Sequence, residues 1–227
     1  MTGHSTAERL RKMATGVCLI VAPVGLALGI WMHPKESMDP AEQLRIIGSD
    51  PGRWATAHWI LMASAVLMAG VFLGLAHLIH QHRPGHAIVG GTMGLLGAMA
   101  LTAVTFAEAS FGSSMGRIGS DGTLAAFKDA TAGPAFLLIL VFSLMGPLGL
   151  IVLGAGAYRA GVIPSWAALA TILGGACVAV SIPSTNLHVL TIAGTVITVV
   201  GLAPIGFMVL GETDEEWAHT PPKAPVA

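Results

Sequence analysis

Ionisable side chains are almost absent from the long apolar stretches of this chain, so the few that occur are the first candidates for chemistry. Glu108 is the only acidic residue inside any of these stretches. His33 follows the first stretch, His58 lies about one helical turn into the second, and His188 opens the last. A buried carboxylate needs a partner or a proton, and ionisable residues within membrane segments are candidates for function. Because consecutive membrane helices alternate in direction, we expect all four side chains near the outer face.

Hydroxyl groups continue this polar set along two of the stretches. Thr102, Thr105 and Glu108 are spaced three apart and therefore share one helix face. The last stretch carries a second polar stripe with steps of three, four and three: His188, Thr191, Thr195 and Thr198. We predict that the second, third and sixth helices surround a polar pocket that opens outward. Its predicted lining residues are His58, Thr102, Thr105, Glu108, His188, Thr191 and Thr195.

Several kinds of chemistry fit this set of side chains, and the spacing does not decide between them. Imidazole and carboxylate groups bind zinc, copper or non-haem iron, so His58, His188 and Glu108 form one candidate metal-ligand set. His58 and His188 are also a candidate pair of axial haem ligands. A substrate or proton site around Glu108 is a further alternative. So is a purely structural set of hydrogen bonds, because no tight motif such as H-E-x-x-H is present.

A second group of histidines lies at the other end of the second stretch. It comprises His77, His80, His82 and His86. A helix rises about 1.5 Å per residue, which places His77 roughly 28 Å from His58. One site therefore cannot contain both groups. We expect this second group to form a solvated, weakly basic loop together with Arg83, and a metal site on the cytoplasmic side is the alternative.

Composition indicates that most of the molecular surface faces lipid. Of the 227 residues, 54% are hydrophobic and only 10% are charged, whereas soluble domains carry about 25% charged residues. So few charges cannot cover a soluble domain. The net charge of −1 and the lack of a basic stripe argue against nucleic acid as a partner.

Six apolar stretches predict an all-α, polytopic transmembrane bundle. They are Met13–Met32, Trp54–Ile79, Ala87–Ser110, Ala132–Tyr158, Pro164–Ile182 and Leu187–Leu210. About 20 apolar residues cross the hydrocarbon core as a helix, and helices satisfy their own backbone hydrogen bonds there. The first stretch is too long for a signal peptide and no A-x-A cleavage site follows it, so we expect a retained helix.

The orientation follows from the basic residues that flank the helices. Arg9, Arg11 and Lys12 precede the first helix, and such clusters stay on the cytoplasmic side. The remaining basic residues divide almost evenly between the two sides, so this cluster decides. We predict that both termini are cytoplasmic, with a tail over residues 1–12 and a single six-helix domain over residues 13–211. The acidic and then Pro-rich segment 212–227 is predicted to be a disordered tail.

Two short helices are expected in the long outer loops, lying on the membrane surface. In the first loop Asp39 is a candidate N-cap, Pro40 suits the first helical position, and Gly48 is a stop signal. In the second loop a run from Asp121 to Lys128 has an apolar side that includes Leu124 and Phe127.

Small residues and prolines predict how the helices pack. Gly90, Gly94 and Gly97 lie on one side of the third helix, where they allow the backbone of a neighbour to approach closely. Prolines interrupt the first, fourth and sixth helices at Pro23, Pro147 and Pro204. Related patterns in helices one to three and four to six fit an inverted repeat of the transporter kind. Independent proline kinks and interfacial tryptophans, which are common in membrane helices, are the simpler explanation of the same patterns.

Two segments carry a family resemblance. They are Pro51-Gly-Arg-Trp54-Ala-Thr-Ala-His58, within His33–Ala76, and Gly156-Ala-Tyr158-Arg159-Ala-Gly161-Val-Ile-Pro164-Ser-Trp166. These segments resemble a widespread group of small bacterial membrane proteins of the domain-of-unknown-function kind. The resemblance implies a fold of six or so membrane helices in the bacterial cytoplasmic membrane, and no particular activity.

The function expected first is small-molecule binding or transport through the predicted outer pocket. One alternative is a membrane redox component that binds haem or a divalent metal. Another is a membrane-embedded enzyme that acts on a lipid-like substrate, with Glu108 as proton donor. The partner predicted from composition is the lipid bilayer, and a homo-oligomer or a partner membrane subunit stays open.

Overall fold

The computed structural model describes residues 6–37, 39–118, 124–125, 128–129, 133–182 and 187–219. Over these ranges the chain is helical and contains no strand. The helices are α1 (Thr6–Met32), α2 (Pro40–Ser49), α3 (Pro51–Ile79), α4 (Pro84–Ile118), α6 (Pro134–Ala160), α7 (Ser165–Ser181), α8 (His188–Gly211) and α9 (Asp214–His219).

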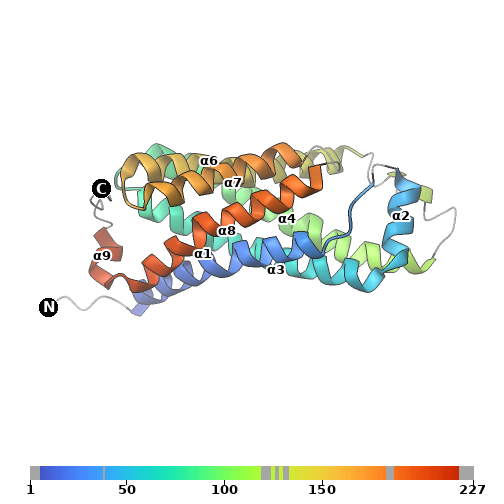
Figure 1. Ribbon diagram of the computed structural model, residues 1–227, viewed down its shortest axis with the longest axis horizontal. Coiled ribbons are helices and arrows are strands. Elements are labelled where there is room, and N and C mark those ends of the chain that lie inside the picture. Colours follow the sequence, from blue (N-terminus) through green and yellow to red (C-terminus); the bar gives the residue numbers. More distant parts are fainter. Residues whose placement is uncertain are drawn as a thin grey trace.

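The long helices lie side by side (Figure 1), and their contacts close them into a ring. Each of α1, α3, α4, α6, α7 and α8 packs against the next one along the chain, and α8 packs back against α1. The short α2 lies at one end of the bundle, where it contacts α4. The start of α1, the end of α8 and α9 lie at the opposite end. The ring therefore has two distinct ends, called here the α2 end and the terminal end.

Within the described residues, five helices are long and apolar enough to cross a membrane: α1, α3, α4 over Pro84–Ser110, α6 over Leu137–Ala160, and α8. Their outward surfaces carry large apolar side chains such as Val66, Leu73 and Ile88, each more than half exposed. Such a surface suits lipid and would be costly in water. The chain is thus a helical protein of the membrane-spanning kind. The fifth apolar stretch forms α7, which has 17 residues and is the shortest helix of the ring.

The predicted packing of small residues is confirmed at the contact of α4 with α6. A Cβ atom on Gly149 of α6 would lie 2.6 Å from the backbone nitrogen of Gly94 and 2.8 Å from the carbonyl oxygen of Gly90. A Cβ atom on Gly97 would meet the backbone of Gly146. Backbone atoms cannot move aside as a flexible side chain can, so this contact requires glycine on both helices.

The short helix predicted in the first loop is present as α2. Asp39 caps it by accepting a hydrogen bond from the Ala41 backbone N–H at 2.9 Å, and Pro40 occupies the first turn. Glu42 forms a bidentate pair with Arg45 rather than reaching back to the cap. The helix predicted near Asp121–Lys128 falls mostly outside the described residues.

The structure corrects the predicted extent of the first helix. Helix α1 begins at Thr6 rather than at Met13, so most of the expected tail is helical. Lys12 is buried because its ammonium group donates to the Glu212 carbonyl oxygen at 2.8 Å and pairs with Asp214 at 2.5 Å.

The prediction of a disordered C-terminal segment is wrong for Asp214–His219, which form α9. The Thr213 hydroxyl accepts from the Glu216 backbone N–H, and the Glu216 carboxylate accepts from the Thr213 backbone N–H at 2.8 Å. This is a capping box. Trp217 is 1% exposed and packs on the His77 ring, with ring centroids 4.3 Å apart. Sequence reasoning weighed the acidic and Pro-rich composition and missed the T-x-x-E signal.

We expect Gly149→Ala to destabilise the bundle by about 1–3 kcal/mol, the usual cost of an added methyl group in a packed core. Gly85→Ala is the matched control, because nothing lies within 4 Å of its added Cβ. Both substitutions raise helix propensity, so their difference isolates the overlap. The measurement is the Tm of each purified variant in detergent. Equal Tm values would show that α4 and α6 are not in this close contact.

Candidate functional site

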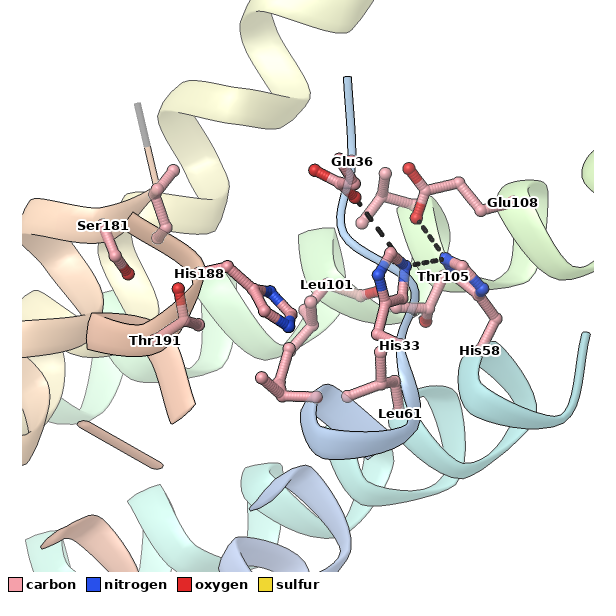
Figure 2. Close-up of a pocket in the computed structure, with 13 residues that line it drawn as sticks. His33, Glu36, His58, Leu61, Leu101, Thr105, Glu108, Ser181, His188 and Thr191 are labelled. Carbon is pink, nitrogen blue, oxygen red and sulfur yellow. Dashed lines mark hydrogen bonds and ion pairs between the residues drawn. The ribbon is translucent and has the colours of Figure 1, made fainter. Parts of the chain in front are cut away.

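A cavity of about 210 Å³ opens at the α2 end of the ring (Figure 2). Five helices contribute to it, either from within or from the residues that directly follow them. The lining residues are Ile30, His33, Glu36, His58, Leu61, Leu101, Val104, Thr105, Glu108, Ser181, Ile182, His188 and Thr191. The walls are therefore mainly apolar, and imidazole and carboxylate groups enter from several sides.

The first turns of α3 hold the neighbouring helices in place. Asp50 caps α3 by accepting from the Arg53 backbone N–H, and Pro51 occupies the first turn. The Arg53 side chain then donates from Nε to the carbonyl oxygen of Met32, the last residue of α1, at 2.7 Å. The indole N–H of Trp54 donates to the backbone carbonyl oxygen of Glu108 at 3.0 Å. These bonds tie α1 and α4 to the start of α3.

His58 is held rigidly one turn after Trp54. Its side chain is 1% exposed, and its Nδ1 donates to the Trp54 carbonyl oxygen at 2.8 Å. The two rings also pack together with centroids 4.4 Å apart. A carbonyl oxygen only accepts, so the proton of this bond must be on Nδ1. Nε2 is therefore the ring atom that points toward the other polar groups.

His33 adopts the same arrangement immediately after α1. Pro34 follows it and stops the helix, because proline cannot donate a backbone hydrogen bond. The ring is buried, and its Nδ1 donates to the Pro34 carbonyl oxygen at 2.7 Å. The Nε2 atom again points inward.

His33, His58 and Glu108, called here the proton triad, meet at a single atom. Nε2 of His58 lies 3.0 Å from Oε2 of Glu108 and 3.2 Å from Nε2 of His33. Figure 2 shows both contacts converging on His58 from opposite neighbours. The three residues come from α4, α3 and the end of α1, so one small cluster connects three helices.

The hydrogen-bond partners determine how many protons the triad holds. With both Nδ1 atoms protonated, neutral imidazoles and an ionised glutamate would direct only lone pairs at one another. Such contacts at 3.0–3.2 Å are repulsive, so at least one additional proton is present. A proton on Nε2 of His58 satisfies both contacts at once, as a donor shared between two acceptors. The geometry therefore favours a His58 imidazolium paired with a Glu108 carboxylate.

The groups just outside the membrane helices are shifted toward their neutral forms. Burial, together with the nearby His58, lowers the pKa of His33 to about 4. The surrounding atoms, together with the nearby Glu108 charge, raise the pKa of Glu36 to about 7, although 45% of that side chain is exposed. Nε2 of His33 lies 3.7 Å from Oε1 of Glu36. At neutral pH His33 is thus an acceptor, consistent with its place in the triad.

The structure brings together most, but not all, of the residues predicted for the pocket. His58, Glu108, His188, Thr105 and Thr191 line the cavity, whereas Thr102 and Thr195 do not. The last two donate their hydroxyl protons to carbonyl oxygens of their own helices. The predicted walls were the second, third and sixth helices, which correspond to α3, α4 and α8.

The structure adds walls from α1, from the segment after it and from the end of α7. Glu36 had not been predicted as a lining residue, although its position three residues after His33 is a usable signal. The contribution of Ser181 and Ile182 has no such signal, because it depends on how α7 packs in the ring.

The metal-ligand set His58, His188 and Glu108 is not assembled in this conformation. Within the part of the chain that the structure describes, no group of three or more His, Cys, Asp or Glu side chains is arranged to hold a metal ion. His58, the residue shared by the metal and haem interpretations, already uses both ring nitrogens in the bonds described above. A metal or haem iron would have to displace Glu108 and His33 from Nε2.

Comparisons of the chain with protein-family models, with characterised proteins and with solved structures give no match. The resemblance to small bacterial membrane proteins therefore stays a prediction, and the function must be argued from the site itself.

We expect the His33 ring to stay neutral down to about pH 5, because its pKa is about 4 rather than the usual 6.5. The unfolded chain would take up this proton first, so acidification from pH 6.5 toward 4 weakens folding through His33. The measurement is the ¹⁵N chemical shift of the histidine rings in detergent micelles, assigned with His33→Gln. A His33 titration near 6.5 would contradict the buried triad.

Proposed function

We propose that this protein is a multi-pass membrane protein that binds a small molecule in the cavity at the α2 end and belongs to the transport class. The observation that carries the proposal is the convergence of the proton triad on an apolar-walled cavity. Small-molecule sites are typically concave and apolar with a few convergent polar groups. Ionisable groups inside a membrane bundle commonly mark ion and substrate pathways.

The construction of the ring supports movement around this cavity. Pro23, Pro147 and Pro204 lie inside α1, α6 and α8. A proline removes one helical hydrogen bond and creates a point at which a helix bends. The cavity is walled by both halves of the ring, so a bend in either half changes its opening. This is the arrangement that a binding site with alternating access requires.

We further propose that α7 is a sixth membrane crossing. Helix α6 ends at Ala160, near the start of α4, where Arg83 donates to the Arg159 carbonyl oxygen. Helix α8 starts at the cavity, at the other end of the ring. The 17 residues of α7 span about 26 Å and connect these two ends. A span of 17 residues is at the lower limit of about 17–25 for a membrane helix.

The cluster of Arg9, Arg11 and Lys12 at the start of α1 supports a cytoplasmic terminal end. The cavity and α2 then face the outside of a bacterial cytoplasmic membrane. This orientation gives the site access to external solutes.

Cysteine labelling tests the orientation. In a background with Cys18→Ala and Cys177→Ala, we expect Lys35→Cys to react with a membrane-impermeant maleimide on intact cells. Gln81→Cys, exposed at the terminal end, should react only after lysis. This outcome follows from the positive-inside rule. The reverse labelling pattern would place the cavity in the cytoplasm and contradict the proposed orientation.

A thermal-shift screen tests small-molecule binding. The panel consists of small organic cations, anions and neutral molecules that fit the cavity. A ligand at 100 times its Kd adds about 2.7 kcal/mol to the stability, so we expect at least one member to raise the Tm of the wild type.

The shift should vanish in Leu101→Trp, which fills the cavity. It should persist in Leu169→Trp, a substitution at an exposed position on α7. Loss of the shift in both variants, or in neither, would contradict a site in this cavity. A panel without any stabilising compound would contradict the proposed function.

A further inference from the structure

The described lining of the cavity carries carboxyl and imidazole groups but neither Lys nor Arg. Charged and titratable groups enter it as His33 and Glu36 after α1, His58 on α3, Glu108 on α4 and His188 on α8. Helix α7 and the residue after it contribute Ser181 and Ile182, which do not titrate. The side chain of the nearby Arg53 donates to the end of α1 instead. While His58 holds the shared proton, its charge balances that of Glu108; once the proton has left, the Glu108 carboxylate attracts a cation and repels an anion.

The proton triad matches the number of donors of one particular kind of cation. A primary ammonium group carries three N–H donors and no acceptor. Once the shared proton has left His58, the triad offers three lone-pair acceptors: Nε2 of His33, Nε2 of His58 and Oε2 of Glu108. Consecutive acceptors lie 3.2 and 3.0 Å apart around the proton, whereas the acceptors around one ammonium nitrogen lie about 4.5–5 Å from one another. One ammonium group can thus take the place of the shared proton when the triad opens by roughly 2 Å, and it then satisfies the acceptors that the proton had bridged.

The rest of the cavity limits the size and nature of the body attached to that group. Its walls include Ile30, Leu61, Leu101, Val104 and Ile182. A volume of 210 Å³ corresponds to about seven water molecules at roughly 30 Å³ each. The space next to the triad therefore suits a short aliphatic chain.

From these contacts we infer that the ligand of the cavity is a small primary alkylammonium ion whose binding releases the proton shared by His33, His58 and Glu108. The inference rests on the proposed small-molecule function and adds the chemical class of the ligand. The exchange is balanced: one monovalent cation enters, His58 changes from imidazolium to neutral imidazole, and one proton leaves to solvent. The site thus couples ligand occupancy to proton movement.

The test is a titration of the detergent-purified protein with propylammonium chloride near pH 7. The heat of binding measured along the titration gives the affinity. A pH-sensitive dye in weak buffer reports the number of protons released. We expect saturable binding with about one proton released per ligand, and an affinity that rises about tenfold per pH unit where the triad is protonated.

Two kinds of control isolate the triad. Tetramethylammonium has the same charge and no N–H donor, so it should neither bind nor release protons, and this comparison needs no variant. Glu108→Gln should lower the affinity for propylammonium at least tenfold and abolish proton release. Glu42→Gln removes an exposed carboxylate on α2 that lies outside the cavity, and it should leave both unchanged.

The possible outcomes separate the inference from the proposed function. Binding of propylammonium without proton release, or equal binding of tetramethylammonium, overturns the inference and leaves a small-molecule site. The inference is likewise overturned, and the small-molecule site remains, if Zn²⁺ or propionate raises the Tm while propylammonium does not. In that case Leu101→Trp must abolish the rise in Tm. A complete absence of cavity-dependent shifts in the screen overturns both.

Discussion

Every inward-facing polar group in this bundle must find a partner among a few neighbours, because lipid and apolar side chains offer none. At the cavity this constraint acts on two imidazole rings whose Nδ1 atoms are already committed to backbone carbonyl oxygens. The remaining Nε2 atoms face each other and the Glu108 carboxylate, so the arrangement holds only while a proton lies between them. One small positive charge thus connects α1, α3 and α4 at the α2 end.

The same constraint explains why the polar side-chain groups around the triad bond to backbone carbonyl oxygens. The Trp54 indole, the Arg53 guanidinium group and both Nδ1 atoms bond to backbone carbonyl oxygens, most of them at helix ends or next to a proline. These hydrogen bonds hold the two imidazole rings in place independently of the shared proton.

The two ends of the ring are built on different principles. At the terminal end, α9 closes the bundle with a buried Trp217 and an ion pair between Lys12 and Asp214. The ion pair is satisfied within the protein, whereas the indole N–H of Trp217 is buried without a hydrogen-bond partner. At the α2 end, the polar groups border an open cavity of about 210 Å³, and three of them share a single proton. Between the two ends, the glycine contacts of α4 with α6 hold backbones too close for either helix to slide freely.

A large part of this fold was predictable from the sequence. Apolar length gave five of the spanning helices within a few residues at most ends, since lipid imposes a minimum length on any crossing segment. The Asp39 cap and the glycines at the α4 contact were also predicted, because both depend on local chemistry. The fifth apolar stretch forms only a short helix of 17 residues, α7, and α9 was missed because its capping box lies in an acidic segment.

For the candidate site, the sequence by itself determined which ionisable groups share one end of the bundle. Alternating helix direction brings His33, His58, Glu108 and His188 to the same level whatever the packing. Only the tertiary structure decided which of them touch. The closed ring places the end of α1 beside α3, so His33 joins His58 and Glu108, while His188 lines the cavity outside this group. Neighbour relations between helices depend on side-chain packing across the ring, and no periodicity along one helix records them.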